Sequence, residues 1–179
     1  MQLDFLKIIF TSVSAVCVTG LTVVDIGTYF TGFGQNVILF LIQFGGMGYM
    51  VLASMLVFFF GKKMSLRSRL AIQDNYTSEM VGIGHLILKI VKLTFVFELA
   101  GMLLMAVRFV PQFGFSRGLF VSLFHSVSAF CNAGFSLFSN SLVNYTGDGY
   151  LNIVFMLLIV FGGLGFIVQF ELGRTVVKR

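Results

Sequence analysis

The chain has 179 residues, of which 58% are hydrophobic and only 11% are charged, and its formal net charge is +5. Because a soluble domain normally contains about 25% charged residues, this composition excludes an ordinary soluble domain and indicates an integral membrane protein. The net charge does not indicate a nucleic-acid-binding protein, because the basic residues lie in separate clusters beside apolar segments and form no single patch.

The first apolar segment, residues 3–16, is shorter than the roughly 20 residues that a helix needs to cross a bilayer. It leads directly into residues 17–22, which contain Thr19 and Gly20. Irregular backbone at membrane depth is tolerated where it is buried in protein or lines a water-filled cavity. Taken alone, this stretch is therefore either a pore-lining loop or a buried packing joint.

Residues 25–36 are predicted to form an external loop with glycines at its turns. Residues 37–60 contain no charged residue and are predicted to form a membrane-spanning helix. The motif Phe-Gly-Gly-Met-Gly-Tyr at residues 44–49 lies near the middle of this helix. We expect its glycines to allow close packing against a neighbouring helix. A gating hinge is the less favoured alternative. Gln43 is expected to hydrogen-bond to a neighbouring helix.

Residues 61–84 form the clearly polar stretch of the chain. Basic residues follow both long apolar segments, at positions 62, 63, 67 and 69 and again at positions 174, 178 and 179. Basic clusters beside membrane helices usually mark the cytoplasmic side, which places residues 61–84 in the cytoplasm and residues 25–36 and 140–149 outside. The connection is either a simple solvated linker or a docking surface for a cytoplasmic partner.

The predicted returning helix, residues 86–109, carries Glu98 deep in an apolar run. An ionisable group there is often functional, but Glu98 lies on an outer helix and not in a loop. We therefore predict a structural hydrogen bond or ion pair to an adjacent helix. Pro111 is expected to stop this helix. His125, early in the second short helix, is expected to be packed and neutral, because no other metal-ligating residue stands at a suitable spacing.

The second half of the chain repeats the first. Residues 124–135 match residues 10–21 without a gap, and Phe-Gly-Gly-Leu-Gly-Phe at residues 161–166 matches residues 44–49. Such a duplication predicts one unit built twice: a short apolar helix, an irregular glycine-containing segment and a long apolar helix, the last at residues 150–170. Two irregular segments at corresponding positions favour a shared binding site.

Cys17 and Cys131 occupy equivalent positions in the two copies. Small buried side chains are favoured over a disulfide, which needs Cα atoms about 4.4–6.8 Å apart. The sequence contains no nucleophile with a base partner, no carboxylate pair and no phosphate-binding glycine loop. It therefore predicts neither an enzyme nor a bound cofactor.

The irregular segments have the chemistry of a cation site. A short helix that enters from outside directs its negative C-terminal end toward the membrane centre. Backbone carbonyls of an extended segment can replace the hydration shell of an ion, and glycine adopts the left-handed dihedrals that turn carbonyls inward. The serines before each segment can hydrogen-bond to its backbone. Neutral carbonyl ligands suit a dehydrated alkali ion better than a divalent one.

At these residues the chain resembles the Trk/Ktr/HKT potassium transporters, particularly the bacterial Ktr membrane subunit. The resemblance rests on Val-Thr-Gly-Leu and Ser-Ala-Phe-Cys-Asn-Ala-Gly-Phe, each followed by Phe-Gly-Gly-x-Gly. It implies potassium uptake across the cell membrane, a dimeric membrane component and a cytoplasmic nucleotide-binding regulatory subunit. By resemblance, Gly20 and Gly134 are filter glycines that bind K⁺ through the backbone, and the other filter residues are Val18, Thr19, Leu21, Asn132, Ala133 and Phe135.

We therefore expect an all-α integral membrane protein built from tandem helix–pore-loop–helix repeats, half of a pseudo-fourfold, potassium-channel-like pore. Residues 1–60 would be a first repeat without its outer helix, residues 61–85 a cytoplasmic connection, and residues 86–179 a second repeat. Two of four filter segments cannot enclose an ion, so we expect a fragment of a longer transporter, in preference to self-association of this chain. The alternative is a non-conducting membrane interaction module or a truncated, inactive fragment.

The topology can be tested with single cysteines introduced as Ser68→Cys and Asn144→Cys in a background free of Cys17 and Cys131. An impermeant thiol reagent added to intact cells should label position 144 and leave position 68 unlabelled until the membrane is permeabilised. Labelling of position 68 from outside would reverse the predicted orientation.

Overall fold

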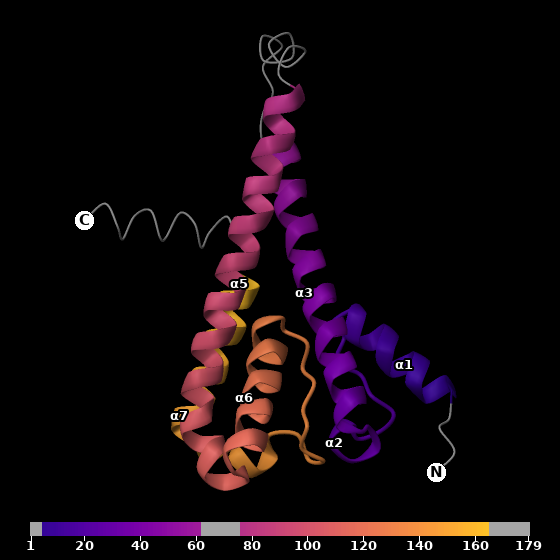
Figure 1. The fold of residues 1–179 in the computed structure, drawn as a ribbon, viewed down its shortest axis with the longest axis vertical. Coiled ribbons are helices and arrows are strands. Elements are labelled where there is room, and N and C mark those ends of the chain that lie inside the picture. The colour runs from indigo at the N-terminus through magenta and orange to yellow at the C-terminus, as the bar shows by residue number, and fades with distance from the viewer. Residues whose placement is uncertain (1–4, 62–75, 165–179) are drawn as a thin grey trace, which may run out of the picture.

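The computed structural model describes residues 5–61 and 76–164, and it describes side chains for residues 5–48 and 88–164. All the secondary-structure elements in this part of the chain are helices (Figure 1), which confirms the predicted all-α class. The elements are α1 (Phe5–Val16), α2 (Ile26–Tyr29), α3 (Gly32–Gly61), α5 (Tyr76–Phe113), α6 (Phe115–Phe130), the 3₁₀ turn η1 (Val143–Tyr145) and α7 (Gly149–Gly163).

Two long helices, α3 and α5, organise the arrangement. They pack against each other, and their upper ends in Figure 1 rise beyond all the other helices. Helices α6 and α7 pack against the lower half of α5, while α1 packs against α3. With 38 residues, α5 is about 57 Å long at 1.5 Å per residue, well above the roughly 30 Å of a bilayer core. Part of α5 therefore extends beyond the thickness of a membrane.

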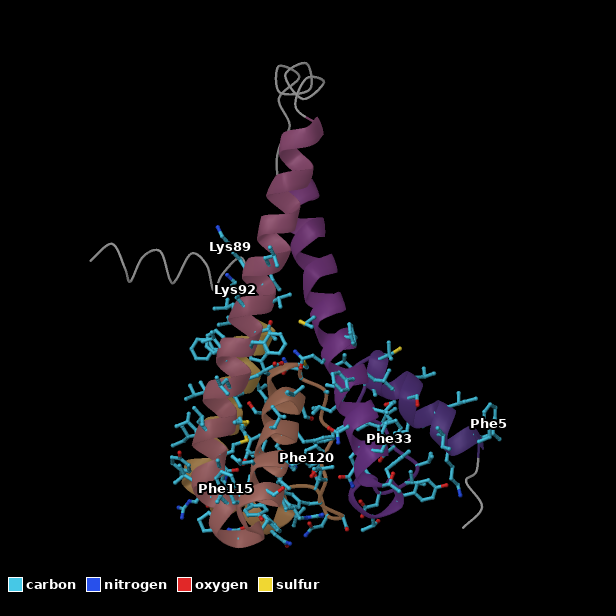
Figure 2. All side chains as sticks on the ribbon, viewed as in Figure 1. Phe5, Phe33, Lys89, Lys92, Phe115 and Phe120 are labelled. Atoms are coloured by element: carbon cyan, nitrogen blue, oxygen red, sulfur yellow. The ribbon has the colours of Figure 1, made fainter. Side chains whose placement is uncertain are left out.

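Among the residues that the structure describes, one helical segment, Leu88–Phe113 of α5, is long and apolar enough to cross a membrane. Phe5–Val16 and Gly149–Gly163 are apolar but shorter. Large apolar side chains cover the outside of the helices, and Phe5 and Phe33 are 72% and 81% exposed (Figure 2). Such an apolar exterior suits lipid or further protein better than water.

The predicted external loop, residues 25–36, contains more helix than expected. It includes α2, and α3 begins at Gly32 instead of residue 37. The cause is Gln35, which is buried and whose Nε2 donates to the carbonyl oxygens of Ile26, Gly27 and Phe30 at 3.1–3.3 Å. Because one side chain satisfies three loop carbonyls, the chain turns compactly and the helix starts early.

The prediction that Pro111 stops the returning helix is wrong, since α5 continues to Phe113. Proline removes one helical N–H, and a loss this close to the end leaves little helix to disrupt. The helix ends at Gly114, which has a φ of 79° and begins the turn into α6. At its other end, α5 includes residues 76–84 of the predicted connection. Residues 62–75 and 165–170, for which a linker and a helix end were predicted, lie outside the described residues.

The glycine motifs bring α3 into direct backbone contact with α1, and α7 into direct backbone contact with α6. A Cβ atom added at Gly45 of α3 would overlap the carbonyl oxygen of Val16, the last residue of α1. A Cβ atom added at Gly162 of α7 would overlap the carbonyl oxygen of Phe130, the last residue of α6. The close packing expected for the first motif is therefore confirmed at Gly45, whereas nothing lies within 4 Å of a Cβ atom added at Gly48. Gly162 of the second motif packs in the same way as Gly45.

Gly162→Ala is expected to destabilise the protein, because the new methyl group meets a backbone carbonyl that cannot rotate away. The neighbouring Gly163→Ala is the matched control: its Cβ meets only Asn132 Nδ2 at 3.8 Å, and alanine gains up to about 1 kcal/mol over glycine inside a helix. Thermal unfolding of the detergent-purified protein, followed by circular dichroism, should show a lower midpoint for Gly162→Ala alone. Equal midpoints for the two variants would contradict the packing argument.

Candidate functional site

The two short helices, α1 and α6, end in the same backbone motif. After each helix, three successive N–H groups donate to corresponding carbonyls of the last two turns, the pattern of a Schellman C-cap. These bonds are Cys17 to Val13 (2.8 Å), Val18 to Ala15 (3.3 Å) and Thr19 to Ser14 (3.0 Å) in the first copy, and Cys131 to Val127 (2.9 Å), Asn132 to Ala129 (3.0 Å) and Ala133 to Ser128 (2.8 Å) in the second. The duplicated sequence thus folds twice into one local structure.

We call residues 18–21 the first loop segment and residues 132–135 the second loop segment. Both contain left-handed residues at matching positions, with φ of 55° at Val18 and 57° at Asn132, then 75° at Gly20 and 72° at Gly134. Glycine adopts this conformation without steric cost, so the left-handed backbone expected at the two glycines is present. A β-branched residue such as Val18 adopts it only under strain of about 1–3 kcal/mol, which means that the surrounding contacts impose it.

The two loop segments meet. A Cβ atom added at Gly20 would lie 2.5 Å from the carbonyl oxygen of Ala133, and one added at Gly134 would lie 3.9 Å from Cα of Gly20. This close approach requires glycine at position 20, because any side chain would displace the opposing backbone. Residues far apart in the sequence therefore lie in contact, as a shared site of the two copies requires.

The surroundings of the two segments differ. In the second segment the side chains of Ala133 and Phe135 are buried, and Asn132 is exposed. In the first segment, Thr19 and Leu21 are exposed. The second segment is enclosed because α5, α6 and α7 pack around it, whereas α1 packs against α3 and leaves one side of the first segment uncovered.

Serine hydroxyls hold the segments to the helices that precede them. Ser128 Oγ donates to the carbonyl oxygen of Phe135 at 2.7 Å, which confirms the expected bond from a serine to the loop backbone. Its counterpart Ser14 instead shares a 2.7 Å hydrogen bond with the hydroxyl of Thr19, so that prediction is wrong for the first copy. The reason is that position 19 supplies a hydroxyl where the second copy has alanine.

Glu98 lies behind the second segment and is 2% exposed. Its Oε2 accepts a hydrogen bond from Gln43 Nε2 of α3 at 3.0 Å, and its backbone carbonyl accepts one from Ser126 Oγ at 2.7 Å. The predicted hydrogen bonds of Glu98 and Gln43 to neighbouring helices are therefore confirmed. Sequence reasoning missed that the Cys131 thiol faces Glu98 Oε1 at 3.9 Å, since nothing in the spacing connects them.

His125 is packed in the core as predicted, although it lies in the second half of α6, because that helix starts earlier than expected. Its Nδ1 lies 2.8 Å from the Val121 carbonyl oxygen and its Nε2 lies 3.0 Å from Ser136 Oγ. The ring stacks on Phe138 with a centroid distance of 4.8 Å. The described residues contain no group of three metal-ligating side chains.

Both cysteines are free thiols, and their environments differ. Cys131 is buried, as predicted, against the carboxyl group of Glu98. Cys17 is exposed, so the prediction of a buried side chain is wrong there. No described element covers Cys17 in the way that α5 covers Cys131.

An open pocket of about 250 Å³ lies where the chain leaves both loop segments. Gly20 and Gly134 line it together with the polar side chains of Thr22, Asp25, Ser136, Ser139 and Ser141. Asp25 Oδ1 accepts the N–H of Gly27 at 2.8 Å. A hydrogen bond from Ser139 is the largest cause that lowers the pKa of Asp25 below its ordinary value of 3.8. Sequence reasoning missed Asp25, although it is the first carboxylate after the first loop segment.

Comparison with known proteins identifies similar transporters. Residues 1–179 match the family model described as TrkH, cation transport protein. The chain is 45% identical over 177 residues to Ktr system potassium uptake protein B of Bacillus subtilis and 41% identical over 167 residues to the protein of the same name from Vibrio alginolyticus. It is 39% identical over 165 residues to potassium/sodium uptake protein NtpJ of Enterococcus hirae.

These alignments cover 97%, 93% and 92% of this chain, respectively. They cover only 39%, 37% and 37% of the relatives. The chain therefore spans less than two fifths of the length of the curated relatives it matches, so the similarity bears on part of each relative.

Proposed function

Because this chain belongs to the TrkH family of cation transport proteins, we propose that it forms part of a transporter for potassium uptake across the cell membrane. The two loop segments would be two of four filter segments, and the ion would bind to their backbone carbonyls. The relatives are named as uptake proteins, which supports transport and not catalysis. K⁺ is the transported ion in this proposal, and the chain needs no cofactor.

One observation carries the proposal: two loop segments at the ends of two short helices share their left-handed positions and come into contact at Gly20. The C-terminal ends of α1 and α6 favour a cation at the segments. Left-handed residues at matching positions give the two copies matching carbonyl directions. A packing joint would need neither the duplication nor two left-handed residues in each copy.

The complete transporter requires more than these residues. We propose that this is part of a multi-pass membrane protein, in which residues 1–60 are a repeat without its outer helix and residues 86–179 are a second repeat. Residues 61–85 would join them, and the remaining repeats would come from further chain or from other copies. A carbonyl cage must surround the ion, and two segments leave it open. By resemblance, a cytoplasmic nucleotide-binding subunit would regulate the assembled protein, and the name "Ktr system" of two relatives fits a multi-component transporter.

Two alternatives to this proposal, a second ion and a second class of protein, lead to different experimental results. One relative is named a potassium/sodium uptake protein, so sodium is the second candidate ion. A non-conducting membrane module is the second candidate class, favoured by the exposed side of the first loop segment. Such a module would tolerate a side chain at Gly134, where nothing but Gly20 Cα lies within 4 Å of an added Cβ.

Gly134→Ser and Gly20→Ser are expected to reduce the preference for K⁺ over Na⁺. At Gly134 the substitution acts through the dihedral alone, because left-handed backbone costs other residues about 1–2 kcal/mol. At Gly20 the new Cβ also meets the Ala133 carbonyl oxygen, so the loss should be larger. Rb⁺ uptake by the complete transporter, with Na⁺ as competitor, measures the effect.

The control for these variants is Gly147→Ser, which lies outside both segments and has no atom within 4 Å of an added Cβ. It should leave selectivity as it is. Unchanged selectivity in both Gly20→Ser and Gly134→Ser would refute the filter assignment.

The 179-residue chain expressed alone should not restore growth of a potassium-uptake-deficient bacterium at low potassium, because two segments do not close a ring around the ion. Supplying the other repeats of such a transporter should restore it. An epitope tag must verify that the chain reaches the membrane in both cases. Full rescue by the chain alone would mean that its copies assemble into a complete pore.

A further inference from the structure

We propose that the pocket beside the two loop segments is a recruitment site for a hydrated monovalent cation, and that Asp25 supplies its charge. The inference rests on the proposed function, because it concerns an ion on its way to the filter. Nothing in the family resemblance or in the relatives' names assigns a role to Asp25. The pocket follows the two loop segments in the chain and lies on the side predicted to be external.

The first step is the position of the charge. Among the residues that line the pocket, Asp25 is the one with a formal charge, and neither Lys nor Arg contributes to the lining. Gly20 and Gly134 line the same pocket, so the carboxylate shares one open space with both loop segments. A negative charge in a concave site raises the local cation concentration.

The second step is that the charge is fixed in place. The N–H of Gly27 donates to Asp25 Oδ1 at 2.8 Å, and Ser139 from the second half of the chain lines the same pocket and lowers the pKa of this carboxyl group. Gly27 packs so tightly that a Cβ atom there would overlap the carbonyl oxygen of Leu137. These contacts hold Asp25 between the two copies and keep it ionised at neutral pH.

The third step is the kind of ion. The pocket holds about 250 Å³, while one water occupies about 30 Å³ of liquid volume, so an ion can enter with several waters. Besides Asp25, the pocket offers neutral oxygens from hydroxyl groups such as those of Thr22 and Ser136. A single carboxylate among neutral oxygens favours a loosely bound monovalent cation, since Ca²⁺ sites use several charged or carbonyl ligands in one shell. Weak binding also lets the ion move on.

The test is Asp25→Asn in the complete transporter, because asparagine caps a helix about as well as aspartate and lacks only the charge. The KM for Rb⁺ uptake should rise several-fold at low ionic strength, while the maximal rate and the K⁺/Na⁺ preference stay the same. The difference should shrink in high concentrations of an impermeant salt, which screens the charge. Asp25→Glu, which keeps the charge, should lie close to the unmodified protein.

Asp148→Asn is the matched control. Asp148 also caps a helix, with its side chain accepting from the N–H groups of Tyr150 and Leu151, but it pairs with Arg108 at 3.3 Å and does not line the pocket. Its neutralisation should leave the KM for Rb⁺ unchanged.

An unchanged KM in Asp25→Asn, or an equal rise in Asp148→Asn, would overturn the inference. If Asp25→Asn does not reach the membrane, Thr22→Lys tests the pocket from a second position, with Gly147→Lys as the control that adds the same charge outside the pocket lining. Only the lysine at position 22 should raise the KM. Failure of the proposed function would appear separately, as absence of selective uptake by the unmodified complete transporter.

Discussion

The structure depends on one contact made twice, between the last carbonyl of the helix before a loop segment and the bare backbone of a glycine in the helix after it. Val16 of α1 meets Gly45 of α3, and Phe130 of α6 meets Gly162 of α7. The contact fixes where α1 ends along α3 and where α6 ends along α7, and hence the level at which each loop segment begins. Backbone groups inside a membrane must be satisfied by the protein itself, and the three N–H bonds that follow each helix do this before the chain turns.

The two copies are alike in backbone and unlike in surroundings. The second loop segment has Asn132 at its first left-handed position, a residue that tolerates this conformation, whereas the first has Val18, which does not. Ser128 reaches a backbone carbonyl, and Ser14 reaches a side chain. Helix α5, with Glu98, closes the back of the second copy. The first copy therefore holds its shape mainly through its own helix end and its contact with α3.

Features governed by local pattern were predictable from the sequence. The short helix ending at Val16, the left-handed glycines and the close packing of Gly45 follow from apolar length, from the duplication and from the lack of a Cβ atom. That Gln43 and Glu98 each bond to a neighbouring helix followed from the cost of leaving a polar group unpaired in an apolar helix, but that they bond to each other was not predicted.

Features that do not follow from hydrophobic pattern were not predictable. The amide group of Gln35 shares its two N–H groups among three nearby carbonyls and lengthens α3, which no periodicity reveals. Pro111 lies so near the end of α5 that its usual effect is lost. Whether Cys17 is buried depends on the elements around it, and it is exposed. Asp25 is influenced by Ser139, which lies more than a hundred residues away in the sequence.

The loop segments offer neutral oxygens, and the carboxyl groups lie outside these segments. Asp25 lies in the pocket, and Glu98 is buried behind the second loop segment. This division fits the proposed function, because a carboxylate within the segments would hold a cation too tightly to release it, while one beside them would raise its local concentration and leave its passage free.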